Sequence, residues 1–122
     1  TGQYAPVMSI FARQLKNKEP LTVVEPGYQT RDFVHVSDVV YANILATQRD
    51  LEKYGEVFNI GTGEGTEIQT IADIISDYQT TIPQRQGEVM HSRAGIDKVK
   101  KLLGWKPSVD VIKWVRSNYD WL

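Results

Sequence analysis

Val57-Phe58-Asn59-Ile60-Gly61-Thr62-Gly63-Glu64-Gly65-Thr66 is the segment of this chain that is most informative about its fold. Residues 57–60 are apolar enough to predict a buried strand, and a glycine loop follows at 61–65. Thr66 and Gln69 then match the capping-box pattern S/T-x-x-E/Q at the start of a helix. That helix has one apolar face, because its apolar residues recur at helical spacing: Ile68, Ile71, Ala72 and Ile75. A strand that leads into a helix in this way favours an α/β fold.

Strands and helices alternate on both sides of this unit. Before it we expect a helix from about Pro6 to Lys18, a strand at 21–24, a strand at 32–36, and a helix starting at Val39 that Ser37 or Asp38 caps. After it we expect a brief strand at 80–82, an irregular polar segment at 83–88, a helix at 97–103 stopped by Gly104, and a last helix from about Ser108 through Trp114. The predicted architecture is a single α/β domain over residues 1–122, with few short strands and flanking helices.

The composition argues against several kinds of site. The 122 residues fit one domain, and the net charge of −1 gives no reason to expect a nucleic acid or an anionic membrane as partner. The chain has no cysteine, which excludes thiolate nucleophiles and cysteine-ligated metals. No apolar run approaches the roughly 20 residues of a membrane span. His35 and His91 lack partners at metal-ligand spacing, so no metal site is expected, and His35 is interpreted as a structural or pocket-lining residue.

The glycine loop at 61–65 has the setting of a dinucleotide-binding loop, but its spacing is wrong. The pattern G-x-G-x-x-G needs glycine at position 66, where Thr66 stands. Glu64 would also place a negative charge beside a phosphate. The favoured interpretation is a tight strand-to-helix turn that needs positive φ.

Two segments offer arginines to an anionic ligand. Arg31 precedes the expected strand at 32–36, and a guanidinium matches phosphate oxygens with paired N–H groups. A pairing of Arg31 with Asp32 or another carboxylate is an equally good interpretation. The second segment is Arg85-Gln86-Gly87-Glu88, whose glycine would let the backbone approach a ligand, although its residues alone favour a solvated loop.

Four motifs occur in a fixed order: Arg31-Asp32-Phe33-Val34-His35-Val36-Ser37-Asp38-Val39, Phe58-Asn59-Ile60-Gly61-Thr62-Gly63, Arg85-Gln86-Gly87-Glu88 and Leu103-Gly104-Trp105-Lys106-Pro107. Together they resemble the C-terminal part of the extended short-chain dehydrogenase/reductases that act on nucleotide sugars. UDP-glucose 4-epimerases are the nearest type, and dTDP-glucose 4,6-dehydratases and UDP-glucuronate-processing enzymes are similar. The resemblance covers essentially the whole chain.

The resemblance implies that an upstream domain of the same enzyme binds the cofactor and carries the catalytic residues. In that family an N-terminal Rossmann domain binds NAD, and a Ser/Thr with a Tyr-x-x-x-Lys pair transfers the proton. None of the six tyrosines of this chain has a lysine four places later. The chain is therefore expected to be the small substrate-binding lobe, without a complete Rossmann domain, and to be inactive alone. NAD is expected on the upstream domain of the full-length enzyme, and no cofactor is expected in this chain.

The family's substrate contacts carry over to six positions. Arg31 and Arg85 match the arginines that contact the diphosphate, and Glu88 matches an acid, more commonly aspartate, that bonds the ribose hydroxyls. Thr22 and Val24 match the strand whose backbone reads the nucleobase, and Val7 matches the pocket wall. No catalytic residue is assigned.

The expected partners follow from the same resemblance. They are a nucleotide-diphosphate sugar, with a UDP-sugar favoured, and the N-terminal Rossmann domain of the same enzyme. The protein is expected in the cytoplasm. An exposed apolar surface would also allow self-association. The alternative function is a stand-alone, non-catalytic nucleotide-binding or interaction domain derived from this lobe.

Overall fold

The computed structural model describes residues 6–121, so residues 1–5 and 122 of the expected domain lie outside the described part. Helices alternate with short strands along it, in the order α1 (Val7–Lys16), β1 (Leu21–Val24), β2 (Thr30–Arg31), α2 (Val36–Gln48), β3 (Thr66–Glu67), α3 (Ile68–Ile75), β4 (Gln79–Ile82), α4 (Asp97–Leu103) and α5 (Val111–Asn118), with a 3₁₀ turn at Tyr119–Trp121. The α/β prediction with few short strands is confirmed.

The strands form two small ladders. β1 pairs in parallel with β4, with Leu21 opposite Gln79 and Val24 opposite Ile82. β2 pairs antiparallel with β3, with Arg31 opposite Thr66. The parallel pair needs a long connection, and the chain between β1 and β4 supplies it with α2 and α3.

The larger core lies around β1. The apolar stripe predicted for α3 is buried in it, together with residues of α1, β1 and α5: Phe11, Leu21, Val23, Ile68, Ile71, Ala72, Ile75 and Val115. Alternate residues of β1 face this core, which is the period-two pattern of a strand with one buried face.

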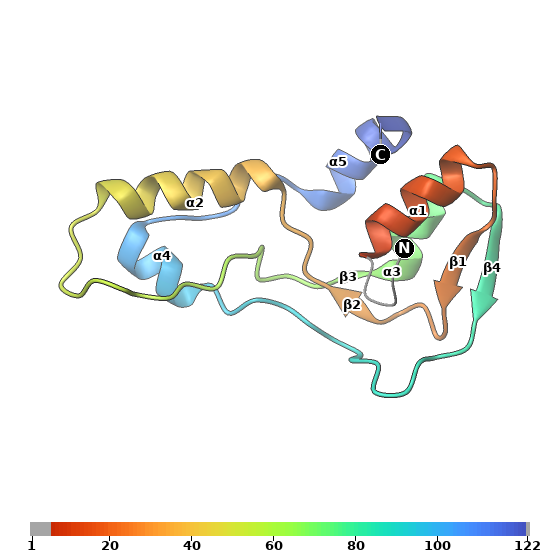
Figure 1. Cartoon of the computed structure of the whole chain (residues 1–122), viewed down its shortest axis with the longest axis horizontal. Helices are drawn as coiled ribbons and strands as arrows, with labels where there is room; N and C mark the ends of the chain where they lie inside the picture. The colour runs from red at the N-terminus through yellow and green to blue at the C-terminus, as the bar shows by residue number, and fades with distance from the viewer. Residues whose placement is uncertain (1–5, 122) are drawn as a thin grey trace.

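A second, smaller core joins α2 to α4. It consists of Ala42, Leu45, Ile96, Val99, Leu103 and Trp105, with Phe58 and Ile60 packed against it. Figure 1 shows α2 and α4 at one end of the elongated molecule and α1, α3, β1 and β4 at the other. The helix predicted at 97–103 and its stop at Gly104, which has φ +66°, are confirmed.

The strand predicted at 57–60 is wrong, since this segment forms no ladder among the described residues. The strand predicted at 32–36 is also wrong. Pairing there is limited to Thr30 and Arg31, and the chain turns into α2 already at Val36. In both places the side-chain pattern suits a strand, but within residues 6–121 no neighbouring strand lies alongside to complete the hydrogen bonds.

The helix starts also differ from the predicted ones. Neither Ser37 nor Asp38 caps α2; the Nδ1 atom of His35 accepts from the Ser37 N–H at 3.1 Å. The last helix begins at Val111 after an Asp110 cap.

The predicted capping box at Thr66 and Gln69 does not form either. The first N–H groups of α3, from Ile68 and Gln69, donate instead to the carbonyls of Gln29 and Gly27 at 3.1 and 2.9 Å. These carbonyls, from residues distant in the sequence, satisfy N–H groups at the start of α3 that lack partners within the helix, which is the role of a capping box.

Candidate functional site

One cavity of about 440 Å³ brings together all six residues to which the sequence assigns substrate contacts. They come from four separate parts of the chain: α1, β1, β2 and the loop after β4. The lining consists of Val7, Thr22, Val24, Arg31, Arg85 and Glu88, with Pro6, Ile10, Gln29, Phe33, Ile68 and Ile82 between them. The wall is therefore mostly apolar, with the charged side chains of two arginines and one glutamate.

Arg31 is held by two contacts. Its Nη1 donates to the carbonyl of Thr30 at 2.8 Å, and its Nη2 donates to Oε1 of Glu88 at 2.9 Å. The Arg31 and Glu88 side chains are 29% and 18% exposed, so this ion pair is partly shielded from water. Of the alternatives left open by the sequence, the structure shows a carboxylate pairing for Arg31, with Glu88 rather than with Asp32.

Arg85 and Glu88 stand at the two ends of one tight turn. The Glu88 N–H donates to the Arg85 carbonyl at 3.1 Å, and Gly87 has φ +79°. Positive φ at the third residue is the requirement of a type II turn, which favours glycine. A Cβ at Gly87 would meet no atom of the chain within 4 Å, so the positive φ of the turn is the requirement for glycine that the lobe itself shows.

Two glutamines that the sequence reading did not single out hold β1 in place. Gln14 brackets Thr22: its Nε2 donates to the hydroxyl at 2.9 Å, and its Oε1 accepts from the backbone N–H at 3.0 Å. Gln29, only 1% exposed, donates to the Val24 carbonyl at 3.0 Å and accepts from the Gly27 N–H at 2.8 Å. The Thr22 N–H and Val24 carbonyl therefore have partners within the protein.

Asp32 anchors the glycine loop to the rest of the lobe. Its carboxylate accepts from the N–H and hydroxyl of Thr62, from Gly63 N–H and from Ala94 N–H, at 2.6 to 3.0 Å. Burial by itself raises the pKa of Asp32, but these hydrogen bonds outweigh it and lower the pKa below its usual value. Gly63 has φ +79°. The loop is thus a turn with positive φ at Gly63, as expected, although residues 57–60 before it form no ladder among the described residues, so it is not the expected strand-to-helix turn. The Asp32 carboxylate accepts from the N–H groups that a dinucleotide phosphate would need.

Asp38 is a second anchoring carboxylate, only 2% exposed. It accepts from the Ser108 N–H and hydroxyl and from the Val109 N–H, while its own carbonyl accepts from Trp105 Nε1 at 2.9 Å. Burial raises the pKa of Asp38, and these bonds together with the nearby His35 bring it below its usual value. The start of α2 is thereby tied to the segment that leads into α5.

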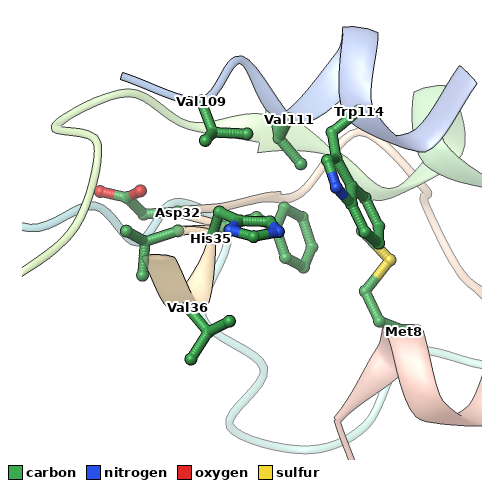
Figure 2. Close-up of a pocket in the computed structure, with 9 residues that line it drawn as sticks. Met8, Asp32, His35, Val36, Val109, Val111 and Trp114 are labelled. Carbon is green, nitrogen blue, oxygen red and sulfur yellow. The ribbon is translucent and has the colours of Figure 1, made fainter. Parts of the chain in front are cut away.

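A second cavity, of about 530 Å³, lies beside the first and is largely apolar. Figure 2 shows His35 in it, between Val36, Val109 and Trp114, while the Asp32 carboxylate points away. The His35 and Trp114 rings are 5.4 Å apart. His35 therefore lines this cavity, in line with the interpretation as a structural or pocket-lining residue, and it also caps α2, which the sequence did not indicate. Within residues 6–121, no cluster of three potential metal ligands is found.

The comparisons with known proteins agree with the motif resemblance. The model of the NAD dependent epimerase/dehydratase family matches residues 1–61, and the chain belongs to that family. A putative UDP-glucose 4-epimerase of Methanocaldococcus jannaschii is 37% identical, over 97% of this chain and 39% of its own length.

Two solved structures extend the comparison. UDP-glucose 4-epimerase of Thermotoga maritima, solved with UDP-glucose, superposes with a TM-score of 0.76 at 35% identity, over 92% of this chain and 37% of that one. UDP-glucuronic acid 4-epimerase of Bacillus cereus, solved with UDP-glucuronic acid and NAD, superposes with a TM-score of 0.77 at 28% identity. The match covers 95% of this chain and 39% of that one. The chain thus spans about two fifths of the length of these relatives. No helix in the described part is long and apolar enough to cross a membrane.

Proposed function

We propose that this chain is the substrate-binding lobe of an NAD-dependent nucleotide-sugar epimerase or dehydratase of the UDP-glucose 4-epimerase type. The observation that carries the proposal is the single cavity lined by Val7, Thr22, Val24, Arg31, Arg85 and Glu88. Four separated parts of the sequence meet there, and they provide both apolar wall and phosphate-binding charge. Relatives with the same lobe are named for UDP-sugars.

Within this site, Arg31 and Arg85 bind the diphosphate, and the apolar side near Val7 and Val24 accepts the nucleoside. Each charge-assisted hydrogen bond contributes about 1.5–3 kcal/mol. Glu88 is the third contact, toward the ribose. Binding energy from the nucleotide would position the sugar against groups outside this chain, which is how remote contacts assist a reaction.

The glycine loop does not fit the phosphates of NAD. The N–H groups of Thr62 and Gly63 in the glycine loop already donate to Asp32. We therefore place NAD on an N-terminal Rossmann domain of the same enzyme, and assign no cofactor-binding or catalytic residue to this chain. The enzyme is proposed to work in the cytoplasm, and the isolated lobe is proposed to self-associate weakly through exposed apolar surface.

The test is isothermal titration calorimetry of the 122-residue chain with UDP. Arg31→Ala and Arg85→Ala should each weaken binding about 10- to 100-fold, as expected for the loss of one charge-assisted contact. Arg116→Ala, an exposed position on α5, is the matched control and should bind as the unsubstituted chain does. UDP binding that both cavity substitutions leave unchanged would refute the site.

A further inference from the structure

A third cavity, of about 570 Å³, adjoins the proposed substrate cavity at Arg31, which lines both. Its volume lies within the roughly 300–1,000 Å³ of ligand pockets in proteins. The polar side chains of Asn59, Ser92 and Arg93 line it together with Arg31. Space for a ligand therefore continues past Arg31, away from the apolar wall near Val24.

Arg93 is held beside Arg31 by the bonds of its two neighbours in the chain. The N–H of the preceding residue donates to the Thr30 carbonyl at 3.2 Å. The N–H of the following residue donates to Oδ2 of Asp32 at 3.0 Å. The backbone on both sides of Arg93 is thus tied to the residues on both sides of Arg31, and two guanidinium groups line one cavity.

The two arginines differ in their partners. Arg31 is paired with Glu88, whereas Arg93 is exposed and forms no hydrogen bond or ion pair with any other residue in the described part of the chain. Asp32 also lines the cavity, but its carboxylate already accepts four hydrogen bonds, three of them from the glycine loop. The N–H groups of Arg93 are therefore open to a ligand.

The position of Arg93 indicates which part of a ligand it would meet. In the proposed function the diphosphate lies between Arg31 and Arg85, so its two charges already have cationic partners in the first cavity. A third guanidinium beyond them matches a further negative charge on the group that the diphosphate carries. The paired N–H groups of a guanidinium fit the two oxygens of a carboxylate.

We infer that the sugar of the nucleotide ligand is an acidic one, a hexuronic acid, whose carboxylate binds Arg93 in the third cavity. The inference rests on the proposed function, because it takes the diphosphate to lie at Arg31. Asn59 and Ser92 line the same cavity and offer polar groups to the sugar hydroxyls. The Bacillus cereus relative was solved with a ligand of this class, UDP-glucuronic acid.

The experiment is isothermal titration calorimetry of the 122-residue chain at pH 7 with UDP, UDP-glucose and UDP-glucuronic acid. The uronic acid should bind about 5- to 10-fold more tightly than UDP-glucose, as expected for a charge-assisted contact in a partly open site. Arg93→Gln should abolish this difference and leave UDP binding unchanged. Arg93→Lys retains the charge without the paired N–H groups and should retain part of the difference. Arg116→Gln, at an exposed position on α5, is the matched control and should retain all of it.

The three ligands separate failure of this inference from failure of the proposed function. If UDP binds but UDP-glucose and UDP-glucuronic acid bind equally well, the acidic sugar is refuted and the nucleotide site stands. If Arg93→Gln weakens UDP and both sugar nucleotides by the same factor, Arg93 contacts the diphosphate and the inference is again refuted. If the unsubstituted chain binds none of the three ligands, the proposed function fails and the inference fails with it.

Discussion

Arg31 Nη2 lies 2.9 Å from Oε1 of Glu88, so an arginine assigned to a phosphate is paired with a carboxylate in the same cavity. A diphosphate that approaches Arg31 has to share this guanidinium with Glu88. The carboxylate also repels the phosphate charge directly. In the proposed site, Glu88 would therefore have two opposing effects on a nucleotide: it would compete for Arg31, and it would offer a hydrogen-bond acceptor to the ribose.

The first prediction separates these effects with inorganic pyrophosphate, which has no ribose. Glu88→Gln removes the charge and should tighten pyrophosphate binding about threefold to fivefold, in line with the modest free energy of a partly exposed ion pair. Calorimetry with pyrophosphate and with UDP measures both effects. If the ribose contact exists, Glu88→Ala should gain affinity for pyrophosphate but not for UDP. Pyrophosphate affinity that falls in both variants would contradict competition for Arg31.

The second prediction concerns acid stability. Because hydrogen bonds hold the folded pKa of Asp32 below its usual 3.8, its ionised form stabilises the fold above that pH, and the contribution is lost as the pH falls through 3.8 and then the folded value. Asp32→Asn should lower the free energy of unfolding by about 2 kcal/mol at pH 7. The difference from the unsubstituted chain should shrink at pH 3.

Urea unfolding at the two pH values measures this difference. Asp77→Asn, at an exposed position before β4, is the control and should change the free energy of unfolding little at either pH. A difference for Asp32→Asn that is the same at pH 7 and pH 3 would contradict the role given to the ionised carboxylate.

The sequence predicted best what depends on neighbours in the chain. The helix at 97–103 and its glycine stop are local features, and so is the apolar stripe of α3. The six cavity residues were assigned through the family resemblance, although residue chemistry alone left Arg31 undecided. The gathering of these residues in one cavity is a tertiary result that no local pattern contained.

What the sequence did not reveal depends on distant partners. Asp32 reads as a neighbour of Arg31, but its partners are 30 to 62 positions away. Asp38 reads as a helix cap, but it bonds a segment 70 positions later. The strand at 57–60 failed for a related reason, because a strand pattern becomes a strand only when another strand lies beside it.

The third prediction tests the cap of α2. His35→Ala removes both the Nδ1 acceptor for Ser37 N–H and the ring contact with Trp114, and it should lower the free energy of unfolding by about 1–2 kcal/mol. Two further substitutions separate the contribution of the cap to this free energy from that of the ring contact. His35→Asn retains a good cap without the ring, and His35→Phe retains a ring without the cap. Urea unfolding at pH 8 should place both between His35→Ala and the unsubstituted chain; an Asn variant as unstable as the Ala variant would show that the cap contributes nothing.

The last prediction concerns the approach of the glycine loop to β2. A Cβ at Gly65 would lie 2.7 Å from Oγ1 and 2.8 Å from Cβ of Thr30, closer than atoms can pack. Thr30 begins the β2–β3 ladder and also contacts His91 at 3.0 Å, so the strand cannot yield without loss of these bonds. Gly65→Ala should therefore lower the free energy of unfolding by about 1–3 kcal/mol.

Gly95→Ala is the matched control for this substitution. A Cβ at Gly95 would meet nothing within 4 Å, so that variant should unfold at nearly the same urea concentration as the unsubstituted chain. Because Arg31 is the other residue of β2, displacement of Thr30 should also shift Arg31 in the cavity. Gly65→Ala should then bind UDP more weakly than Gly95→Ala under conditions where both are folded. Equal stability and equal UDP affinity in the two variants would show that the contact between the glycine loop and β2 neither supports the fold nor positions Arg31.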